Sequence, residues 1–326
     1  MRSKSKQISL QKIISTRDAF GEELVELGRK HKEVVVLDSD LSKATKTCWF
    51  AKEFPDRFFD MGISEQDMLG TAAGLSLCDK IPIVSTFAIF ATAKAFDQIR
   101  NTIAYPRINV KIIATHGGIT IGADGASHQP IEHITLMRVI PNMTIIVPAD
   151  GIEAKTALKY AVEKVKGPVF IVVGRDPTPV IFSDDHQFDF RHGEVLKEGK
   201  DVAIIAAGIM VEKALRAGEK LGERGINACI VNIHTIKPID KELIIKIARK
   251  VGGIVTAEEH SIIGGLGSAV AEIISENSPV PLKRIGLRDR FGQSGSAEEL
   301  LREYNLTEED IVKAAEELMK RKGSSL

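Results

Sequence analysis

Short runs of β-branched and other apolar residues alternate along the chain with longer stretches whose apolar residues recur at helical spacing. In the first half, the short runs are Val34–Leu37, Ile81–Val84, Val110–Ala114, Thr144–Val147 and Val169–Val173. The helical stretches between them are Asp18–Gly28, Glu65–Leu77, Ala91–Ala104 and Glu153–Val165. Strands that alternate with helices predict βαβ units, and therefore an α/β fold with doubly wound, mostly parallel sheets covered on both faces.

This pattern breaks over residues 175–200, where prolines and aspartates replace the apolar runs, so we expect a linker there. A second series of strand-like runs follows, at Val202–Ala206, Cys229–Ile233, Gly253–Thr256 and Val280–Ile285. Residue patterns typical of helix N-termini, reciprocal in the first case, occur at Asp150–Glu153, Ser296–Glu299 and Thr307–Asp310. We therefore predict two α/β domains, at about 1–185 and about 192–326.

Composition and charge exclude several classes of protein. Of the 326 residues, 44% are hydrophobic and 27% charged, which is a globular mixture and argues against a disordered or fibrous chain. Lys+Arg and Asp+Glu are 44 each, with no block of like charge, so no footprint for nucleic acid or anionic lipid is expected. Three widely spaced cysteines suit a reducing compartment. The first ten residues lack the apolar core of a signal peptide, and no apolar run approaches the ~18 residues of a membrane span, so we expect a cytoplasmic protein.

Candidate chemistry lies in polar loops that follow predicted strands, where open parallel sheets gather their functional groups. Three such loops are unusually polar, at Asp38–Ser42, Asp60–Gln66 and Thr115–Pro130. The third combines several glycines with His116, Asp124 and His128. Glycines let the backbone approach a ligand closely, and histidines can donate hydrogen bonds to hydroxyl, carbonyl or phosphate oxygens. No third ligand lies at metal-binding spacing, so the pattern predicts a polar ligand site rather than a metal site, without specifying the ligand.

Structural roles explain several of these residues equally well from the pattern alone. A carboxylate in the first turn of a helix is favoured by the helix dipole, which accounts for Glu65. Surface or core positions account for His116 and His128. Aromatic residues at helical spacing usually belong to a core, which accounts for Phe87 and Phe90.

Longer motifs carry a resemblance to a known family. The stretches GISEQDMLGTAAGLS, STFAIFATAKAFDQIRN and IGADGASHQPIEHITLMRVIPNMTIIVPAD, in this order, resemble the pyrimidine-binding domain of transketolases. The later segments VNIHTIKPID and AEEHSIIGGLGSAVAE resemble the C-terminal domain of the same family. The match covers nearly the whole chain, which is therefore similar to the last two of the family's three α/β domains.

The resemblance also implies a cofactor and a partner. In the family, thiamine diphosphate binds between the diphosphate domain of one subunit and the pyrimidine domain of another. This chain lacks a Gly-Asp-Gly followed some thirty residues later by Asn, the pattern that holds Mg²⁺ and the diphosphate. It therefore looks like the C-terminal half of a split transketolase, active only with a separate N-terminal subunit that supplies the Mg²⁺ ligands. The expected assembly is a homodimer of this chain that becomes a two-plus-two heterotetramer with the partner.

Four residues match family positions beside the cofactor. Glu65 matches the activating glutamate, whose carboxyl pairs with the pyrimidine nitrogen N1′ and so promotes removal of the thiazolium C2 proton. Phe87 and Phe90 match the aromatic wall against which the aminopyrimidine packs, with Phe90 the better candidate for direct stacking. Asp40 matches an aspartate near the cofactor.

Five residues match family positions that bind the sugar phosphates. Asp124 matches an aspartate that binds a substrate hydroxyl, and His128 a catalytic histidine near the ketol hydroxyls. His116 matches a histidine directed toward the sugar phosphate, while Arg17 and Arg175 match two phosphate-binding arginines. The implied reaction transfers a two-carbon ketol unit from a ketose phosphate to an aldose phosphate, as in the pentose phosphate pathway.

Related enzymes offer alternatives to this assignment. Deoxyxylulose-phosphate synthases, which join decarboxylated pyruvate to glyceraldehyde phosphate, share the architecture and the activating glutamate, as do the β subunits of 2-oxoacid dehydrogenases. The GADGASHQP loop and the two phosphate arginines favour transketolase. A family phosphate-binding serine would fall near Ala44–Thr45, so this chain departs from the pattern there. A non-catalytic homologue is a third alternative, against which the presence of Glu65, Asp124 and His128 argues.

Overall fold

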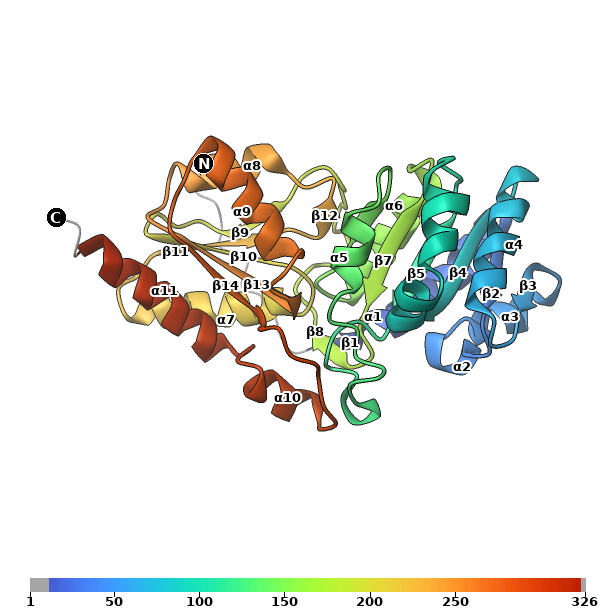
Figure 1. Ribbon diagram of the computed structural model, residues 1–326, viewed down its shortest axis with the longest axis horizontal. Coiled ribbons are helices and arrows are strands. Elements are labelled where there is room, and N and C mark those ends of the chain that lie inside the picture. The colour runs from blue at the N-terminus through green and yellow to red at the C-terminus, as the bar shows by residue number, and fades with distance from the viewer. Residues whose placement is uncertain (1–11, 324–326) are drawn as a thin grey trace.

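The structure is a computed structural model that describes residues 12–323. The N-terminal segment considered above for a signal peptide lies outside these residues. Two large sheets, each with helices packed against it, lie next to each other along the long axis of the molecule (Figure 1). A mixed α/β architecture with mostly parallel sheets is therefore confirmed.

The first sheet has seven strands in the order β12-β6-β7-β5-β4-β2-β3, all parallel except β12. The strands are β2 (Val34–Asp38), β3 (Phe58–Asp60), β4 (Ile81–Phe87), β5 (Lys111–Thr115), β6 (Thr144–Ile146), β7 (Val169–Val173) and β12 (Thr235–Lys237). The helices around it are α1 (Thr16–Lys30), α2 (Ser42–Thr45), α3 (Cys48–Glu53), α4 (Glu65–Leu77), α5 (His133–Arg138) and α6 (Gly151–Glu163).

Both faces of this sheet are buried, which explains why its strands are continuous apolar runs. Val34 and Val36 pack in the cluster that contains α1 and α6 residues. Val35 and Leu37, which point the other way, pack in the cluster that contains residues of α4 and α5. Apolar side chains are therefore needed on both faces of the strand, as at Val34–Leu37.

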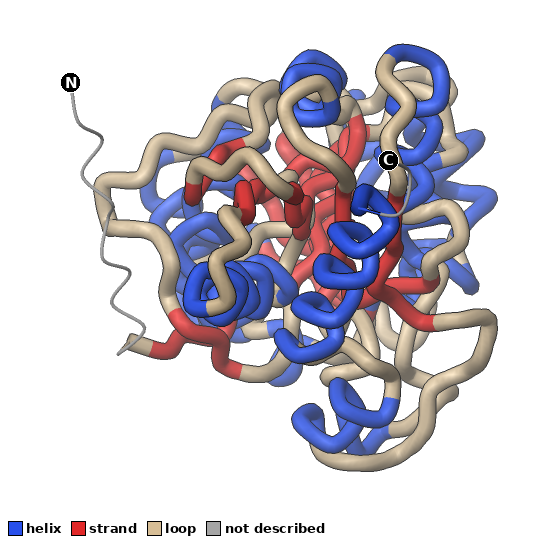
Figure 2. Tube along the Cα trace, turned by 90° about the vertical axis from the view of Figure 1, so that its left-hand side faces the viewer, coloured by secondary structure: helices blue, strands red, loops and turns tan. Residues whose placement is uncertain are grey.

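The second sheet has five strands in the order β14-β13-β10-β11-β9, of which only β9 runs antiparallel to its neighbour. The strands are β9 (Glu194–Lys197), β10 (Val202–Ala206), β11 (Ala228–Asn232), β13 (Ile254–Ser261) and β14 (Leu282–Leu287). The helices are α7 (Met210–Glu223), α8 (Lys241–Ala248), α9 (Leu266–Asn277), α10 (Ala297–Glu303) and α11 (Glu308–Gly323). Helices again lie on both sides of the strands (Figure 2).

The linker prediction for residues 175–200 is wrong in part. This segment contains β8 (Pro177–Pro179), which pairs antiparallel with β1 (Ile13–Ser15), and it ends in β9 of the second sheet. In addition, β12 from the second half of the chain pairs antiparallel with β6 of the first sheet. The two halves are therefore joined by strand pairing as well as by the chain. The proposed boundary between about 185 and 192 stays a prediction.

Two local expectations also change. The predicted helix Ala91–Ala104 consists of two π-helical segments, Phe90–Lys94 and Gln98–Ala104. At the start of α6, Asp150 accepts from the backbone N–H of Glu153, but Glu153 does not reciprocate, because its carboxylate binds the N–H of Ala149 and the side chain of Asn232. Reciprocal capping does occur at Ser296 and Glu299.

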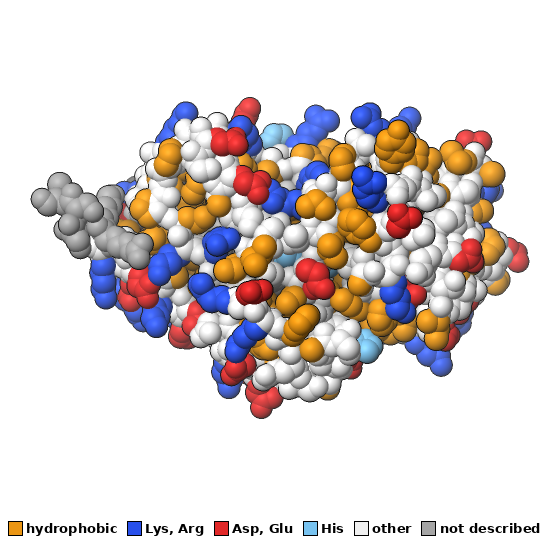
Figure 3. Space-filling model, viewed as in Figure 1, with side chains coloured by type: hydrophobic (Ala, Val, Ile, Leu, Met, Phe, Trp, Pro, Cys, Tyr) orange, Lys and Arg blue, Asp and Glu red, His pale blue; other side chains and the backbone are white. Residues whose placement is uncertain are grey.

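On the face shown in Figure 3, acidic and basic side chains are interspersed and form no large patch of one sign. No helix within residues 12–323 combines the length and the apolar character needed to cross a membrane.

Candidate active site

Parallel strands of the first sheet end at one edge, and the residues that follow them include most of the predicted site groups. Asp40 follows β2, Glu65 begins α4 after β3, and Phe87 is the last residue of β4. His116 follows β5, and Arg175 lies two residues beyond β7. The parallel arrangement thus brings to one edge side chains that are widely separated in the sequence.

Glu65 is buried and pairs with a lysine whose ammonium group also lies over an aromatic ring. Its side chain is 3% exposed, and Lys94 Nζ lies 3.4 Å from each carboxylate oxygen. The same ammonium group lies 4.4 Å from the centroid of the Phe90 ring, which stacks on Phe87 at 5.7 Å between centroids and 10° between planes. Lys94 is not among the residues that the sequence motifs predict for the site. Its position four residues after Phe90 in a helical stretch is the signal that could have found it.

His116 connects Arg17 to the strand ends through a chain of hydrogen bonds. Arg17 Nη1 lies 3.4 Å from His116 Nε2, and because a guanidinium group only donates, Nε2 is the acceptor. Burial, together with the nearby charge of Arg17, lowers the pKa of His116 to about 3, so the ring is neutral. Its one proton therefore sits on Nδ1, which donates to Thr115 Oγ1 at 2.9 Å. Thr115 Oγ1 in turn donates to the carbonyl oxygen of Thr86 at 3.3 Å.

The loop between β5 and α5 carries the remaining predicted groups. Asp124 is exposed, and one of its carboxylate oxygens lies 3.6 Å from Arg175 Nη1. The same nitrogen donates to the carbonyl oxygen of Ile121 at 3.0 Å, so Arg175 also holds the loop. The His128 ring lies edge-on to Phe90, with 5.5 Å between ring centroids.

Phe87 joins the two groups of residues. Its ring centroid lies 3.8 Å from that of His116 and 5.7 Å from that of Phe90. An aromatic wall with a buried carboxylate therefore adjoins a cluster of guanidinium and imidazole groups. This arrangement can pack a planar ring against the phenylalanines while the guanidinium groups bind an anion nearby.

Two positions are not part of this arrangement. Asp40 is exposed, with a backbone φ of 59°, and its N–H donates to Asp60 Oδ1 at 3.1 Å. Within residues 12–323, no hydrogen bond or ion pair joins its carboxylate to the other predicted groups. Thr45 is buried and donates its hydroxyl to Asp38 Oδ2 at 2.7 Å, so this hydroxyl does not replace the family's phosphate-binding serine.

No group of three or more His, Cys, Asp and Glu side chains in the described part of the chain is arranged to hold a metal ion. Mg²⁺ ligands on a partner subunit therefore stay a prediction.

Comparisons with known proteins identify the family of the chain. The domain family described as "Transketolase, pyrimidine binding domain" matches residues 12–179, and "Transketolase, C-terminal domain" matches residues 191–311. A protein of Methanocaldococcus jannaschii, provisionally named a transketolase C-terminal section, is 50% identical over 94% of this chain and 96% of its own length. A 6-deoxy-6-sulfo-D-fructose transketolase subunit of Clostridium sp. strain MSTE9 is 41% identical over 94% of this chain and 95% of its own length.

A solved structure gives the same result for the three-dimensional arrangement. A split-gene transketolase, described as an inactive β4 tetramer, is 52% identical and superimposes with a TM-score of 0.86. The alignment covers 94% of this chain and 98% of that one. The chain therefore belongs to the transketolase family, and it spans the pyrimidine-binding and C-terminal domains of that family.

Proposed function

We propose that this chain is the C-terminal subunit of a thiamine diphosphate-dependent transketolase, which transfers a two-carbon ketol unit from a ketose phosphate to an aldose phosphate. The observation that carries the proposal is the position of Phe87. Its ring contacts Phe90, beside the buried Glu65, and also His116, beside Arg17. Phe87 thus lies between an aromatic surface for a planar cofactor and a site for an anion. A reaction between that cofactor and a sugar phosphate requires the two to be adjacent.

The residues around Glu65 fit an aminopyrimidine ring. Phe87 and Phe90 offer aromatic surface for stacking. The Glu65 carboxylate has a single side-chain partner among the described residues, Lys94 at 3.4 Å, and so keeps lone pairs for a ring nitrogen. When bound, thiamine diphosphate supplies the carbon nucleophile and the electron sink for cleavage of the ketose C–C bond. Glu65 would share a proton with the pyrimidine N1′, in place of its present partner Lys94, whose side chain is 44% exposed.

The guanidinium groups of Arg17 and Arg175 suit the phosphate end of a substrate, because a planar fork of donors matches phosphate oxygens. Arg175 exchanges its weak contact with Asp124 for the phosphate, which frees the carboxylate to accept from a sugar hydroxyl. We assign the ketol hydroxyls to His128, which lies on the same loop and beside Phe90. His116, neutral and hydrogen-bonded to Arg17, orients that guanidinium group.

The partner is expected to be a polypeptide of roughly 270–300 residues, the size of a diphosphate-binding domain with its extensions. It would supply the Mg²⁺ ligands and the diphosphate contacts. The lengths of the relatives support this inference, since proteins named as a transketolase section or subunit match this chain over 95% or more of their own length. We also infer that the enzyme works in the pentose phosphate pathway of the cytoplasm. The three free cysteines support a reducing compartment.

A reconstitution assay tests the function. The chain is co-purified with the candidate partner and supplied with thiamine diphosphate, Mg²⁺, xylulose 5-phosphate and ribose 5-phosphate. We expect ketol transfer by the mixture and none by either subunit alone. A parallel assay with pyruvate and glyceraldehyde 3-phosphate separates this function from deoxyxylulose-phosphate synthesis. Turnover by the single chain, or product only in the parallel assay, contradicts the proposal.

The assembly is inferred from apolar side chains left exposed at the C-terminal ends of helical segments beside the first sheet. Leu77 of α4, Tyr105 after the second π-helical segment and Val139 after α5 are 73%, 83% and 67% exposed, and all belong to segments on the same side of the first sheet. Large exposed apolar groups are usually covered by association. We expect a homodimer through this side and a two-plus-two heterotetramer with the partner. The relative described as an inactive β4 tetramer supports self-association without turnover. Light scattering that finds a monomer and a fully active one-to-one complex contradicts this arrangement.

A further inference from the structure

The loop from His116 to Pro130 carries three of the predicted substrate groups, yet little regular structure holds it. Apart from one turn of 3₁₀-helix at Gly122–Asp124, it is irregular. His116, Gly118, Gly122 and Gly125 within it have positive φ. The positions of its side chains must therefore depend on contacts with neighbouring segments.

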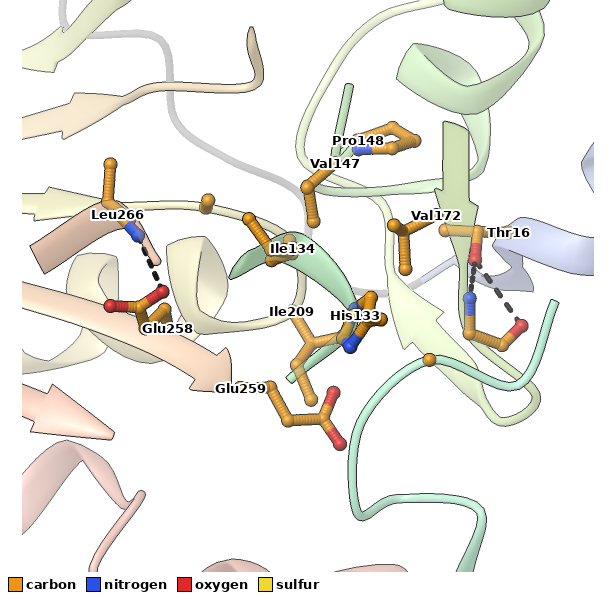
Figure 4. A pocket seen from close by; sticks show the side chains of 14 residues that line it. Thr16, His133, Ile134, Val147, Pro148, Val172, Ile209, Glu258, Glu259 and Leu266 are labelled. Atoms are coloured by element: carbon orange, nitrogen blue, oxygen red, sulfur yellow. Dashed lines mark hydrogen bonds between the residues drawn. The ribbon is translucent and has the colours of Figure 1, made fainter. Parts of the chain in front are cut away.

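The first such contact comes from the C-terminal half of the chain. Glu259, on β13 of the second sheet, accepts a hydrogen bond from the backbone N–H of Thr120 with its Oε1 at 2.7 Å. The loop packs so closely here that a Cβ on Gly118 would lie 2.2 Å from the Glu259 carboxyl carbon. In the space between the two halves, Glu259 extends from the end of β13 toward the loop that follows β5 (Figure 4).

A second contact lies at the other end of the loop. Gln129, which is buried, donates from Nε2 to the carbonyl oxygens of Ile119 and Gly122 at 3.2 Å each. The same nitrogen lies 2.9 Å from the carbonyl oxygen of Gln293, in the segment that precedes α10. Two fixed points from the second half thus hold the loop, one at each end of its tight turn.

The neighbouring carboxylate offers a natural comparison. Glu258 also lies on β13 and is 1% exposed, but its two oxygens accept from the backbone N–H groups of Leu266 and Gly267 at 2.7 Å each, at the start of α9. Its hydrogen bonds stay within the second half of the chain. Adjacent glutamates on one strand therefore differ in a single respect that matters here, namely whether they hold the loop.

We propose that Glu259 is a positioning residue through which the C-terminal domain fixes the substrate-binding loop, by holding the N–H of Thr120. The expected effect on substrate binding rests on the proposed function, whereas the expected restraint of the loop does not. This restraint gives the C-terminal domain a defined task, although all the site residues predicted in this chain lie on the other domain. The contact needs an acceptor at a fixed reach rather than a charge. Burial raises the pKa of Glu259 to about 7, so the neutral and charged forms both occur near neutral pH.

Three variants separate the effect of the length of the side chain at position 259 from the effect of its charge. Glu259→Gln keeps an acceptor oxygen at the same distance from the backbone, whereas Glu259→Asp keeps the charge but withdraws it by one methylene group. Glu259→Ala removes both. The matched control is Glu258→Asp, which shortens a carboxylate at the adjacent position. If Glu259→Ala does not fold, the Asp and Gln variants still decide the question.

The first readout is hydrogen exchange of the Thr120 amide in the isolated chain, referred to the amides of β10 to correct for global stability. We expect exchange about 10-fold faster or more in Glu259→Asp and Glu259→Ala, because a buried N–H has lost its acceptor. In Glu259→Gln and Glu258→Asp, we expect rates within about threefold of the native chain, because the Thr120 hydrogen bond remains. This readout does not require any enzyme activity.

The second readout is kinetics of the reconstituted enzyme. We expect Glu259→Asp to raise the KM for the ketose phosphate about 10-fold, with a smaller change in kcat, and Glu259→Gln to restore the native value. Unchanged Thr120 exchange in Glu259→Asp, or equal changes in Glu258→Asp, overturns the proposal. If exchange responds as expected but the native pair shows no ketol transfer, the failure lies with the proposed function and not with the contact.

Discussion

Replacement of Lys94 by methionine should destabilise the free chain, because it leaves the Glu65 carboxylate buried without its cation. The Glu65 side chain is 3% exposed, and Lys94 is its one side-chain partner in the described part of the chain. Methionine fills similar volume and can still pack on the Phe90 ring, so the change removes the charge more than the packing. The lost interaction is therefore chiefly electrostatic.

The size of the effect can be worked out from the geometry. At an effective dielectric constant of about 20, unit charges 3.4 Å apart attract each other by about 5 kcal/mol. Because the Lys94 side chain is 44% exposed, solvent screens much of this attraction, and desolvation of Glu65 opposes it further. We therefore expect a coupling free energy of about 1–2 kcal/mol between the two side chains.

A double-mutant cycle measures this coupling. Urea unfolding of the native chain, Lys94→Met, Glu65→Gln and the double variant gives the four free energies of unfolding. Lys80→Met, on an exposed lysine that forms no ion pair with any residue of 12–323, is the matched control and should change stability by less than about 0.5 kcal/mol. If the coupling is below about 0.3 kcal/mol, which is within the usual error of additivity, Lys94 does not neutralise Glu65 and the reasoning is refuted.

Three further predictions concern the reconstituted enzyme and the fold. Glu65→Gln should lower ketol transfer by orders of magnitude, since an amide cannot exchange a proton with N1′. Exchange of the cofactor C2 proton at the native rate contradicts that role. Arg17→Ala and Arg175→Ala should each raise the KM for phosphorylated sugars roughly 10- to 150-fold, because each removes a charge-assisted contact of about 1.5–3 kcal/mol. An equal rise in KM for unphosphorylated analogues would indicate that the arginine has a structural role. Burial raises the pKa of Glu153 from 4.5 to about 8, so between these values the folded chain holds a proton that the unfolded chain releases, and stability falls as pH rises. The free energy of unfolding of Glu153→Gln should therefore rise by about 2 kcal/mol relative to that of the native chain as the pH goes from 5.5 to 7.5. Urea unfolding of both proteins at the two pH values measures this change. If the difference between the two proteins is the same at both pH values, the raised pKa of Glu153 is contradicted.

Much of the fold could be predicted from the sequence because parallel strands buried on both faces need apolar side chains at every position. Val34–Leu37 and Val169–Val173 are such runs, and these two predicted strands start and end within a residue of the observed ones. The exceptions are short strands that make few apolar contacts. β8 consists of Pro177, Thr178 and Pro179, a composition that local reasoning assigns to a linker, and it is a strand only because β1 pairs with it.

The candidate site likewise contains residues that the sequence predicts and one that it does not. Glu65, Phe87 and His116 could be selected because motif and strand-end position both depend on local sequence, although their roles stay predictions. Lys94 could not be selected with equal force. Its contact with Glu65 joins side chains 29 residues apart, and local periodicity does not indicate such a contact.

What the sequence by itself determined was the class of fold, the order of the strands along the chain and the set of side chains available at their carboxyl ends. What only the tertiary structure decided was which of those side chains touch, and which distant segments hold them in place. Glu259 and Thr120 are 139 residues apart, and nothing in the residues around either one indicates the hydrogen bond between them. The same holds for β12 and β6, which pair across the two halves. The physical reason is that periodicity and capping act over a few residues, whereas a contact between sheets exists only after both have folded and packed together.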